Sequence, residues 1–341
     1  MRRDAVGPAR SGRPARGWRR TVVLLSWLVG FGLGIVLLAL AVVLGPYAAR
    51  VRRFRADPTA GYHADFFVYV SPGARRLARD GAGVTLLVQP NNSGVNSDDP
   101  AVHRRDAWLM GFGRRRLAEE LEVVLLVPAF VRPAADWQIL SHALDRDVLT
   151  TTRSDLARLD LQLLAMVDRA RATLAAEGLA VDERFLIQGF SASGSFAARF
   201  AALHPRRVRA AAIGAPGGWP IAPVASYGGE ALPYPVGVAD LEELTGAPFD
   251  AAGFAAVPKL FVLGSLDTND SVDFRDGWEE EPAALVHRLF GADAVERWPR
   301  AEAIYRDAGG NARFVLVDGV GHDRRKLQPL ATRFFAEVLG R

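Results

Sequence analysis

The sequence contains no cysteine among its 341 residues. This absence excludes disulfides, thiolate metal sites and thiol nucleophiles. It does not indicate a cellular compartment, because a chain of this length can bury a core without disulfides. Half of the residues are hydrophobic, which is enough for a sizeable core in one large domain or two small ones.

Basic residues are in the minority outside the N-terminus, although the net charge of the whole chain is +4. Residues 1–55 hold eleven arginines and a single acid, Asp4. Subtracting these from the 42 basic and 38 acidic residues leaves 31 basic and 37 acidic residues in the rest of the chain. This mildly acidic body shows no basic stripe suited to nucleic acid, so we expect no nucleic-acid partner.

Charge is also absent from residues 21–44, a run of 24 residues. As a helix, such a run is about 36 Å long, against about 30 Å for the hydrocarbon of a bilayer. The core of a cleaved signal peptide is shorter, and no A-x-A-like cleavage site follows Leu44. The run therefore predicts a single transmembrane helix that anchors the chain, with a cleaved signal as the alternative.

Arginines flank this run unequally, with seven before it and four soon after it. The positive-inside rule then places the basic segment 1–20 in the cytoplasm and the body of the protein outside it. Residues 45–64 become a juxtamembrane linker in this interpretation, and residues 65–341 form the main domain. We therefore expect a single-pass protein of the cell membrane.

Beyond residue 65, continuous apolar runs alternate with amphipathic helical patterns. Such runs are typical of parallel strands that are buried on both faces. The expected strands are 66–70, 84–89, 123–130, 184–188, 208–216, 259–264 and 313–319. The expected helices include 154–177, 196–204 and 327–340. The alternation predicts an α/β fold with a mostly parallel central sheet flanked by helices.

Residues 215–256 interrupt this alternation and are rich in glycine, proline and aromatic residues. A segment of about forty residues is too long for a simple connector. Its aromatic residues, among them Trp219 and Tyr234, favour an ordered segment, because disordered segments are poor in aromatics. We interpret the segment as a cap-like insertion over a site.

The turn QGFSASGSF, residues 188–196, leads directly from a predicted strand into a predicted helix. A serine in such a turn is held clear of the backbone, and the residues two before and two after it must be small. Ser191 has Gly189 two residues before it and stands at the junction, whereas Ser193 and Ser195 fall in the first helical turn. Ser191 is therefore the predicted nucleophile. Ser193 stands where glycine is usual, and we expect its side chain to be tucked in and unreactive.

A serine nucleophile needs a base, and the base needs an orienting carboxylate. In this architecture they follow in the order serine, acid, histidine, each after a later strand. Asp267 follows the predicted strand 259–264, with Asp270 and Asp273 as alternatives, and His322 follows the last predicted strand. His322 is therefore the predicted base and Asp267 the predicted acid.

Stabilisation of an oxyanion requires two backbone N–H groups. One is expected from Ala192, the residue after the nucleophile. The other is expected from the loop after an earlier strand, which corresponds to QPNNSG at residues 89–94. Asn92 or Asn91 is the candidate in this loop, and we choose Asn92.

The three turns GFSAS, GSLDTND and GVGHD together resemble the nucleophile, acid and histidine turns of the α/β-hydrolase superfamily. The resemblance covers about residues 65–341 and extends to bacterial esterases of the polyhydroxybutyrate-depolymerase and dienelactone-hydrolase kind. It implies an α/β-hydrolase fold, an acyl-Ser191 intermediate, and catalysis without a cofactor or metal. Ser193 in place of glycine, and the lack of a His-Gly pair in the oxyanion loop, depart from the family pattern.

These features predict a membrane-anchored serine hydrolase that cleaves a carboxylic ester, with a small-molecule or lipid-like substrate. Two alternatives remain, which are acyl transfer on the same fold and a non-catalytic binding protein. All three positions of the Ser-His-Asp triad are filled, which favours an enzyme over a binding protein.

Overall fold

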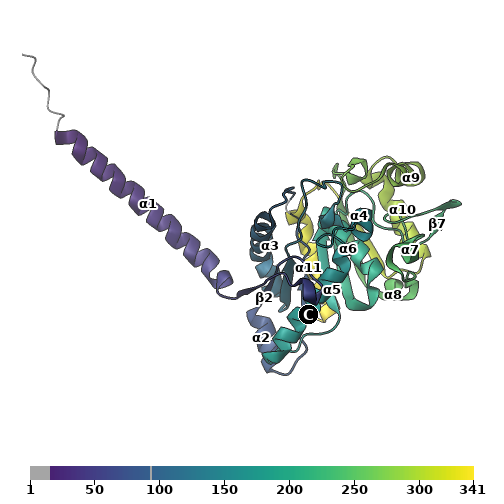
Figure 1. Ribbon diagram of the computed structural model, residues 1–341, viewed down its shortest axis with the longest axis horizontal. Helices are drawn as coiled ribbons and strands as arrows, with labels where there is room; N and C mark the ends of the chain where they lie inside the picture. The colour runs from purple at the N-terminus through teal and green to yellow at the C-terminus, as the bar shows by residue number, and fades with distance from the viewer. Residues whose placement is uncertain (1–15, 93) are drawn as a thin grey trace, which may run out of the picture. The chain divides into compact units, whose positions relative to one another are not determined.

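The computed structural model describes residues 16–92 and 94–341. Most of the predicted cytoplasmic segment 1–20 lies outside the described residues, and so do several side chains of the run 21–44. The chain divides into two compact units, residues 1–49 and residues 50–341 (Figure 1). The described part of the first unit is dominated by one helix, α1 (Arg16–Ala48).

Helix α1 includes all of the uncharged run 21–44. Among its described side chains, the large apolar residues Trp27, Phe31 and Leu38 are exposed. A search of the described residues finds no helix whose length and apolar character would let it cross a membrane. The transmembrane helix predicted over residues 21–44 is therefore not confirmed.

The second unit is built on an eight-stranded sheet with the order β1-β2-β4-β3-β5-β6-β9-β10. All neighbours from β4 to β10 are parallel, whereas β2 is antiparallel to both β1 and β4. This arrangement confirms the predicted mostly parallel sheet. The strands are β1 (Val51–Phe54), β2 (Phe66–Val70), β3 (Leu86–Val88), β4 (Val124–Pro128), β5 (Phe185–Phe190), β6 (Val208–Gly214), β9 (Lys259–Gly264) and β10 (Ala312–Val317).

Helices cover both faces of this sheet. Strand side chains alternate between faces, so Phe185 and Gln188 of β5 point to opposite sides. Phe185 lies against Phe200 of α6 at a ring distance of 5.7 Å, and Gln188 accepts a hydrogen bond from Gln328 of α11. Helices α6 and α11 therefore lie on opposite faces. The helices of this unit are α2 (Pro72–Arg79), α3 (Pro100–Glu120), α4 (Arg146–Thr150), α5 (Leu159–Ala176), α6 (Ala192–Leu203), α7 (Leu241–Thr245), α8 (Ala251–Ala256), α9 (Glu280–Phe290), α10 (Ala294–Asp307) and α11 (Arg324–Leu339).

The main core lies between the sheet and the α5–α6 layer. Every residue of β2, β3 and β4 is buried, as the continuous apolar runs in the sequence predict. Phe185, Phe196 and Phe200 are completely buried, and the Phe200 ring contacts both of the others, stacked on Phe196 and tilted against Phe185. Full burial of such a side chain contributes roughly 1.5–3 kcal/mol.

Strand β1 differs from the sequence prediction, because it lies within residues 45–64, the expected linker. Its sequence, VRRF, is short and half charged, so it gives no strand signal. Two contacts fix it in place. The Phe54 ring stacks on Phe66 of β2 at 4.6 Å, and Arg53 forms an ion pair with Asp65. The sheet is thus extended by a strand that depends on its neighbour for stability.

The insertion 215–256 has regular elements of its own, which are β7 (Ser226–Tyr227), β8 (Glu230–Ala231), α7 and α8. Trp219 stacks on Phe290 of α9 at 3.9 Å, and its indole N–H donates to the Val236 carbonyl. Figure 1 shows α7, α8, α9 and α10 grouped at the end of this unit away from α2 and α3. Trp219 therefore belongs to a second, smaller core on the α9 side, whereas Tyr234 and Phe254 of the insertion are buried in the main core.

We predict that Phe200→Ala lowers the free energy of unfolding by about 3–5 kcal/mol, because it leaves a cavity beneath the sheet. Urea denaturation followed by circular dichroism measures the change. The matched control is Leu161→Ala on α5, whose side chain is exposed, and we expect its effect to stay within about 0.5 kcal/mol. Equal effects of the two substitutions would contradict the placement of Phe200 in the core.

Candidate active site

Ser191 stands between the end of β5 and the start of α6, with φ 61° and ψ −131°. A positive φ is unusual for a residue other than glycine and costs about 1–3 kcal/mol. The backbone around Ser191 maintains this conformation. Its N–H donates to the Gly214 carbonyl of β6, and its carbonyl accepts from the N–H groups of Gly194 and Ser195. The structure thus places Ser191 at the strand–helix junction that the sequence predicts.

Two glycines allow the close approach of backbone segments at this turn. A Cβ atom on Gly189 would lie 1.8 Å from the carbonyl oxygen of Ser193, which no packing adjustment can accommodate. A Cβ atom on Gly194 would lie 2.6 Å from the carbonyl oxygen of Gly214. Gly189 keeps the turn tight, and Gly194 lets α6 pass directly over β6.

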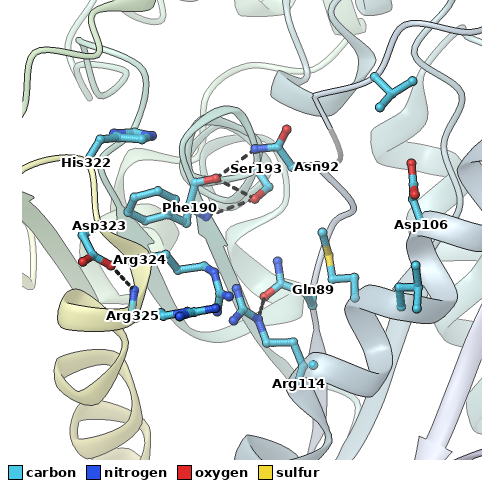
Figure 2. Close-up of a pocket in the computed structure, with 14 residues that line it drawn as sticks. Gln89, Asn92, Asp106, Arg114, Phe190, Ser193, His322, Asp323, Arg324 and Arg325 are labelled. Carbon is cyan, nitrogen blue, oxygen red and sulfur yellow. Dashed lines mark hydrogen bonds between the residues drawn. The ribbon is translucent and has the colours of Figure 1, made fainter. Parts of the chain in front are cut away.

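Ser193 is buried, and its hydroxyl is used within the turn. It accepts a hydrogen bond from the Phe190 N–H at 3.0 Å and donates to the Phe190 carbonyl at 2.9 Å (Figure 2). The side chain is therefore tucked against the strand–helix crossing, as the sequence predicts. It replaces the glycine usual at this position and adds two hydrogen bonds across the turn.

Asp267 and His322 are brought together from the ends of β9 and β10. The two carboxylate oxygens of Asp267 lie 3.1 and 2.9 Å from Nδ1 of His322. Because an ionised carboxylate only accepts hydrogen bonds, Nδ1 carries the proton, and Nε2 of the neutral ring is left as an acceptor. The Asp267 side chain is fully buried, whereas that of His322 is 25% exposed. The His322 ring packs 4.5 Å from the ring of Phe190, the residue before Ser191.

The two alternative acids make other contacts. Asp270 forms an ion pair with the buried Arg297 at 2.6 Å and accepts from the Val272 N–H. Asp273 contacts His287 at 2.7 Å. Among Asp267, Asp270 and Asp273, only Asp267 is hydrogen-bonded to His322.

In the part of the chain that the structure describes, no hydrogen bond joins Ser191 to His322. Of the residues that the structure describes, none is hydrogen-bonded to the Ser191 hydroxyl. Both residues follow carboxyl ends of strands in the same parallel part of the sheet, which gathers them at one edge. Catalytic hydrogen bonds are often loose without substrate and tighten when it binds.

The predicted oxyanion residues also lie at this edge. The Asn92 side chain donates to the Phe190 carbonyl at 3.2 Å (Figure 2). Asn91 instead bonds both backbone groups of Phe130, so its side chain holds two loops together. Ala192 is the first residue of α6, where a backbone N–H has no partner within the helix. Asn91 and Asn92 thus differ in their side-chain partners, and the choice of Asn92 as the oxyanion residue stays a prediction.

A cavity of about 770 Å³ opens beside His322 (Figure 2). Its wall includes Asn92, Phe190 and Ser193, together with residues of α3 and α11, whereas Ser191 itself is not part of the lining. No residue of the insertion 215–256 lines this cavity. The lining of this cavity therefore does not support the interpretation of the insertion as a cap. The buried apolar side chains of the insertion are divided between the main core and the second core.

The wall of this cavity carries charged side chains that the sequence analysis did not identify. Arg114 comes from α3, and Arg324 and Arg325 come from the first turn of α11. They belong to distant segments and form no local motif, so no pattern in the sequence marks them. Among the described residues, no group of three or more His, Cys, Asp or Glu side chains is arranged to hold a metal ion.

No family model and no curated protein matches the sequence. Solved structures do match. The structure is similar to poly(aspartic acid) hydrolase-1 from Sphingomonas sp. KT-1, with a TM-score of 0.54 and 20% identity over 83% of this chain and 97% of that one. It is also similar to LpqC, a poly(3-hydroxybutyrate) depolymerase from Bordetella parapertussis, with a TM-score of 0.51 and 20% identity over 89% and 94% of the two chains. With the sheet described above, these similarities show the α/β-hydrolase fold.

We predict that Gly189→Ala destabilises the protein by about 3 kcal/mol or more, because the new methyl group meets backbone that cannot move away. Thermal unfolding of purified protein measures the effect. Gly113→Ala on α3 is the matched control, since nothing lies within 4 Å of its added Cβ atom. Helix propensity makes that change stabilising by up to about 1 kcal/mol. A tolerated Gly189→Ala would contradict the tight turn.

Proposed function

We propose that this protein is a serine hydrolase that cleaves a carboxylic ester through an acyl-Ser191 intermediate. One observation carries the proposal: the Asp267–His322 hydrogen bonds lie at the sheet edge where the strand–helix turn presents Ser191. The α/β-hydrolase fold agrees with this reading, and both matched structures are described as enzymes that break down polymers. No cofactor is needed for the reaction.

In the first half of the proposed reaction, the Ser191 oxygen attacks the carbonyl carbon of the ester. Nε2 of His322 accepts the hydroxyl proton, and Asp267 stabilises the imidazolium that forms. The carbonyl oxygen becomes an oxyanion, which the Ala192 N–H and an N–H of Asn92 stabilise. The amino end of α6 adds a favourable dipole at the same point.

Collapse of the tetrahedral intermediate breaks the bond to the alcohol, which leaves with the proton from His322. A water molecule then donates a proton to His322 and attacks the acyl carbon. The second intermediate expels the Ser191 oxygen, which recovers its proton from His322, and the carboxylic acid is released. If another alcohol takes the place of water, the same steps give acyl transfer, so product analysis distinguishes these two outcomes.

We predict that Ser191→Ala abolishes labelling by a fluorophosphonate probe and lowers hydrolysis of a p-nitrophenyl ester by about 10⁴-fold or more. The nucleophilic oxygen is lost while the turn stays intact. Ser193→Gly is the matched control, because its hydroxyl is used within the turn, and we expect labelling and activity largely to remain. Labelling of Ser191→Ala at the level of the unmodified protein would overturn the proposal. A folded, unmodified protein that neither binds the probe nor hydrolyses esters would point to a binding protein.

We also propose that residues 21–44 anchor the hydrolase domain to the cell membrane, with the N-terminus cytoplasmic and the domain outside the cytoplasm. The support comes from the 24 uncharged residues and their arginine flanks. The exposed Trp27, Phe31 and Leu38 of α1 add to it, because large exposed apolar surfaces mark contact with membranes or partners. An ester in a membrane or envelope would then lie within reach of the domain.

We predict that the full chain remains with the membrane fraction after carbonate extraction, and that external protease degrades the domain in spheroplasts. Removal of residues 1–49 releases the domain, because the second unit has its own core. Recovery of the full chain in the soluble fraction would contradict the anchor. Protection from external protease, with membrane association retained, would contradict the orientation alone.

A further inference from the structure

We propose that the cavity beside His322 binds a carboxylate carried by the ester substrate, through Arg114, Arg324 and Arg325. This inference rests on the proposed function and narrows its substrate to an anionic ester. The lining of the cavity includes His322, Phe190, which precedes Ser191, and Ser193, which lies two residues after it. A substrate whose ester lies at Ser191 therefore extends its remaining part toward the three guanidinium groups.

Arg114 is the first observation that points to an anion. It is more than nine-tenths buried, and its Nε donates to the Gln89 side chain at 2.9 Å. It forms no ion pair with any of the residues that the structure describes. A buried charge without a countercharge is costly, and proteins seldom retain one that has no role. Figure 2 shows Arg114 on the α3 side of the cavity, near Gln89.

The start of α11 gives a second, independent observation. Arg324 and Arg325 occupy the first turn of this 16-residue helix, where the helix dipole disfavours cations. Neither is paired with a carboxylate of a described residue. Asp323 precedes them, but its carboxylate accepts from the Arg325 and Lys326 N–H groups as the helix cap (Figure 2). Burial, followed by the charge of Arg325, lowers the pKa of the Arg324 guanidinium.

These unfavourable electrostatic contributions all act at the same cavity. The buried guanidinium, the two guanidinium groups at a helix start and the helix dipole all contribute positive potential to one cavity. An anion in that cavity offsets all of them, because it pairs with the arginines and faces the amino end of a helix. The planar guanidinium fork matches a carboxylate in two parallel hydrogen bonds.

Two carboxylates of the lining, Asp106 and the helix cap Asp323, oppose this potential. Asp106 of α3 lines the same cavity, and one of its oxygens is buried without a hydrogen-bond partner among the described residues. Figure 2 places Asp106 across the cavity from Arg324 and Arg325. The exposed Val95 and Leu109 also belong to this wall. With three arginines against two carboxylates, the lining keeps an excess of positive charge, and the position of Asp106 across the cavity orients an anionic substrate.

The test compares two pairs of esters that differ in one negative charge. The mono-p-nitrophenyl ester of adipic acid is paired with p-nitrophenyl hexanoate, which places the carboxylate on the acyl side. For the alcohol side, 4-acetoxybenzoate is paired with 4-methylphenyl acetate. We expect kcat/KM to favour the anionic member of at least one pair, and the preference to fall with added salt. No preference in either pair would overturn the inference.

Substitutions then show which residues cause the preference for the anionic ester. We expect Arg114→Gln and Arg324→Gln each to lower the ratio of kcat/KM for the anionic ester to that for its neutral partner about tenfold or more. Arg116→Gln and Arg333→Gln are the matched controls, because both are exposed on the same two helices, outside the cavity lining. Arg325→Gln and Arg114→Lys extend the series. An unchanged ratio in Arg324→Gln and Arg325→Gln, which alter no buried contact, would overturn the inference even if Arg114→Gln fails to fold.

A binding measurement separates this inference from the proposed function. Adipate and inorganic phosphate are titrated by calorimetry into full-length Ser191→Ala protein, with and without Arg324→Gln. Adipate binding that Arg324→Gln weakens about tenfold supports the site whether or not esters are hydrolysed. Absence of adipate binding, or phosphate binding alone, would overturn it. If Ser191 is needed to hydrolyse neutral esters but adipate does not bind, the proposed function stands. Only the inference of an anion site is then wrong.

Discussion

The close approach of α6 to β5 and β6 is the constraint on which the rest of the structure depends. At Gly189 and Gly194 the backbones come so near that a single methyl group would collide with a carbonyl oxygen. This contact forces Ser191 into a conformation with positive φ and turns its side chain away from the sheet. The contact of Phe200 of α6 with Phe185 of β5 helps to hold α6 against the sheet. The core therefore supplies the free energy that keeps Ser191 in a strained conformation at the turn.

Much of this arrangement could be predicted from the sequence, because its signals are local. Buried parallel strands must be continuous apolar runs, and those runs identified seven of the eight strands of the main sheet. Ser191 could be chosen because a tight turn needs a small residue two positions earlier. Asp267 and His322 could be placed because parallel strands deliver the residues that follow them to one edge. Their mutual contact follows from topology and not from any motif.

The features that could not be predicted depend on distant partners. Strand β1 is too short and charged to form alone, and only Phe66 and Asp65 hold it in the sheet. The sequence offers Asp267 and Asp270 in the same turn. The structure distinguishes them, because the distant and buried Arg297 forms an ion pair with Asp270. Aromatic residues showed that the insertion 215–256 would be ordered, but not which surface they would cover. Trp219 and Tyr227 both contact Phe290 of α9, which is more than sixty residues away, so local sequence could not identify their partner.

The same topology links the nucleophile to the charged cavity. Helices α6 and α11 each follow a parallel strand, so their amino ends, both positive, face the same edge of the sheet. At α6 this potential stabilises the oxyanion of the proposed reaction. A carboxylate on the substrate would oppose that stabilisation: at about 8 Å and an effective dielectric constant of about 20, it repels an oxyanion by about 2 kcal/mol. Arginines around the carboxylate cancel most of this repulsion. Efficient reaction of an anionic ester at Ser191 then needs both the oxyanion site and the three arginines. The oxyanion site stabilises the developing charge, and the arginines offset its repulsion by the substrate carboxylate.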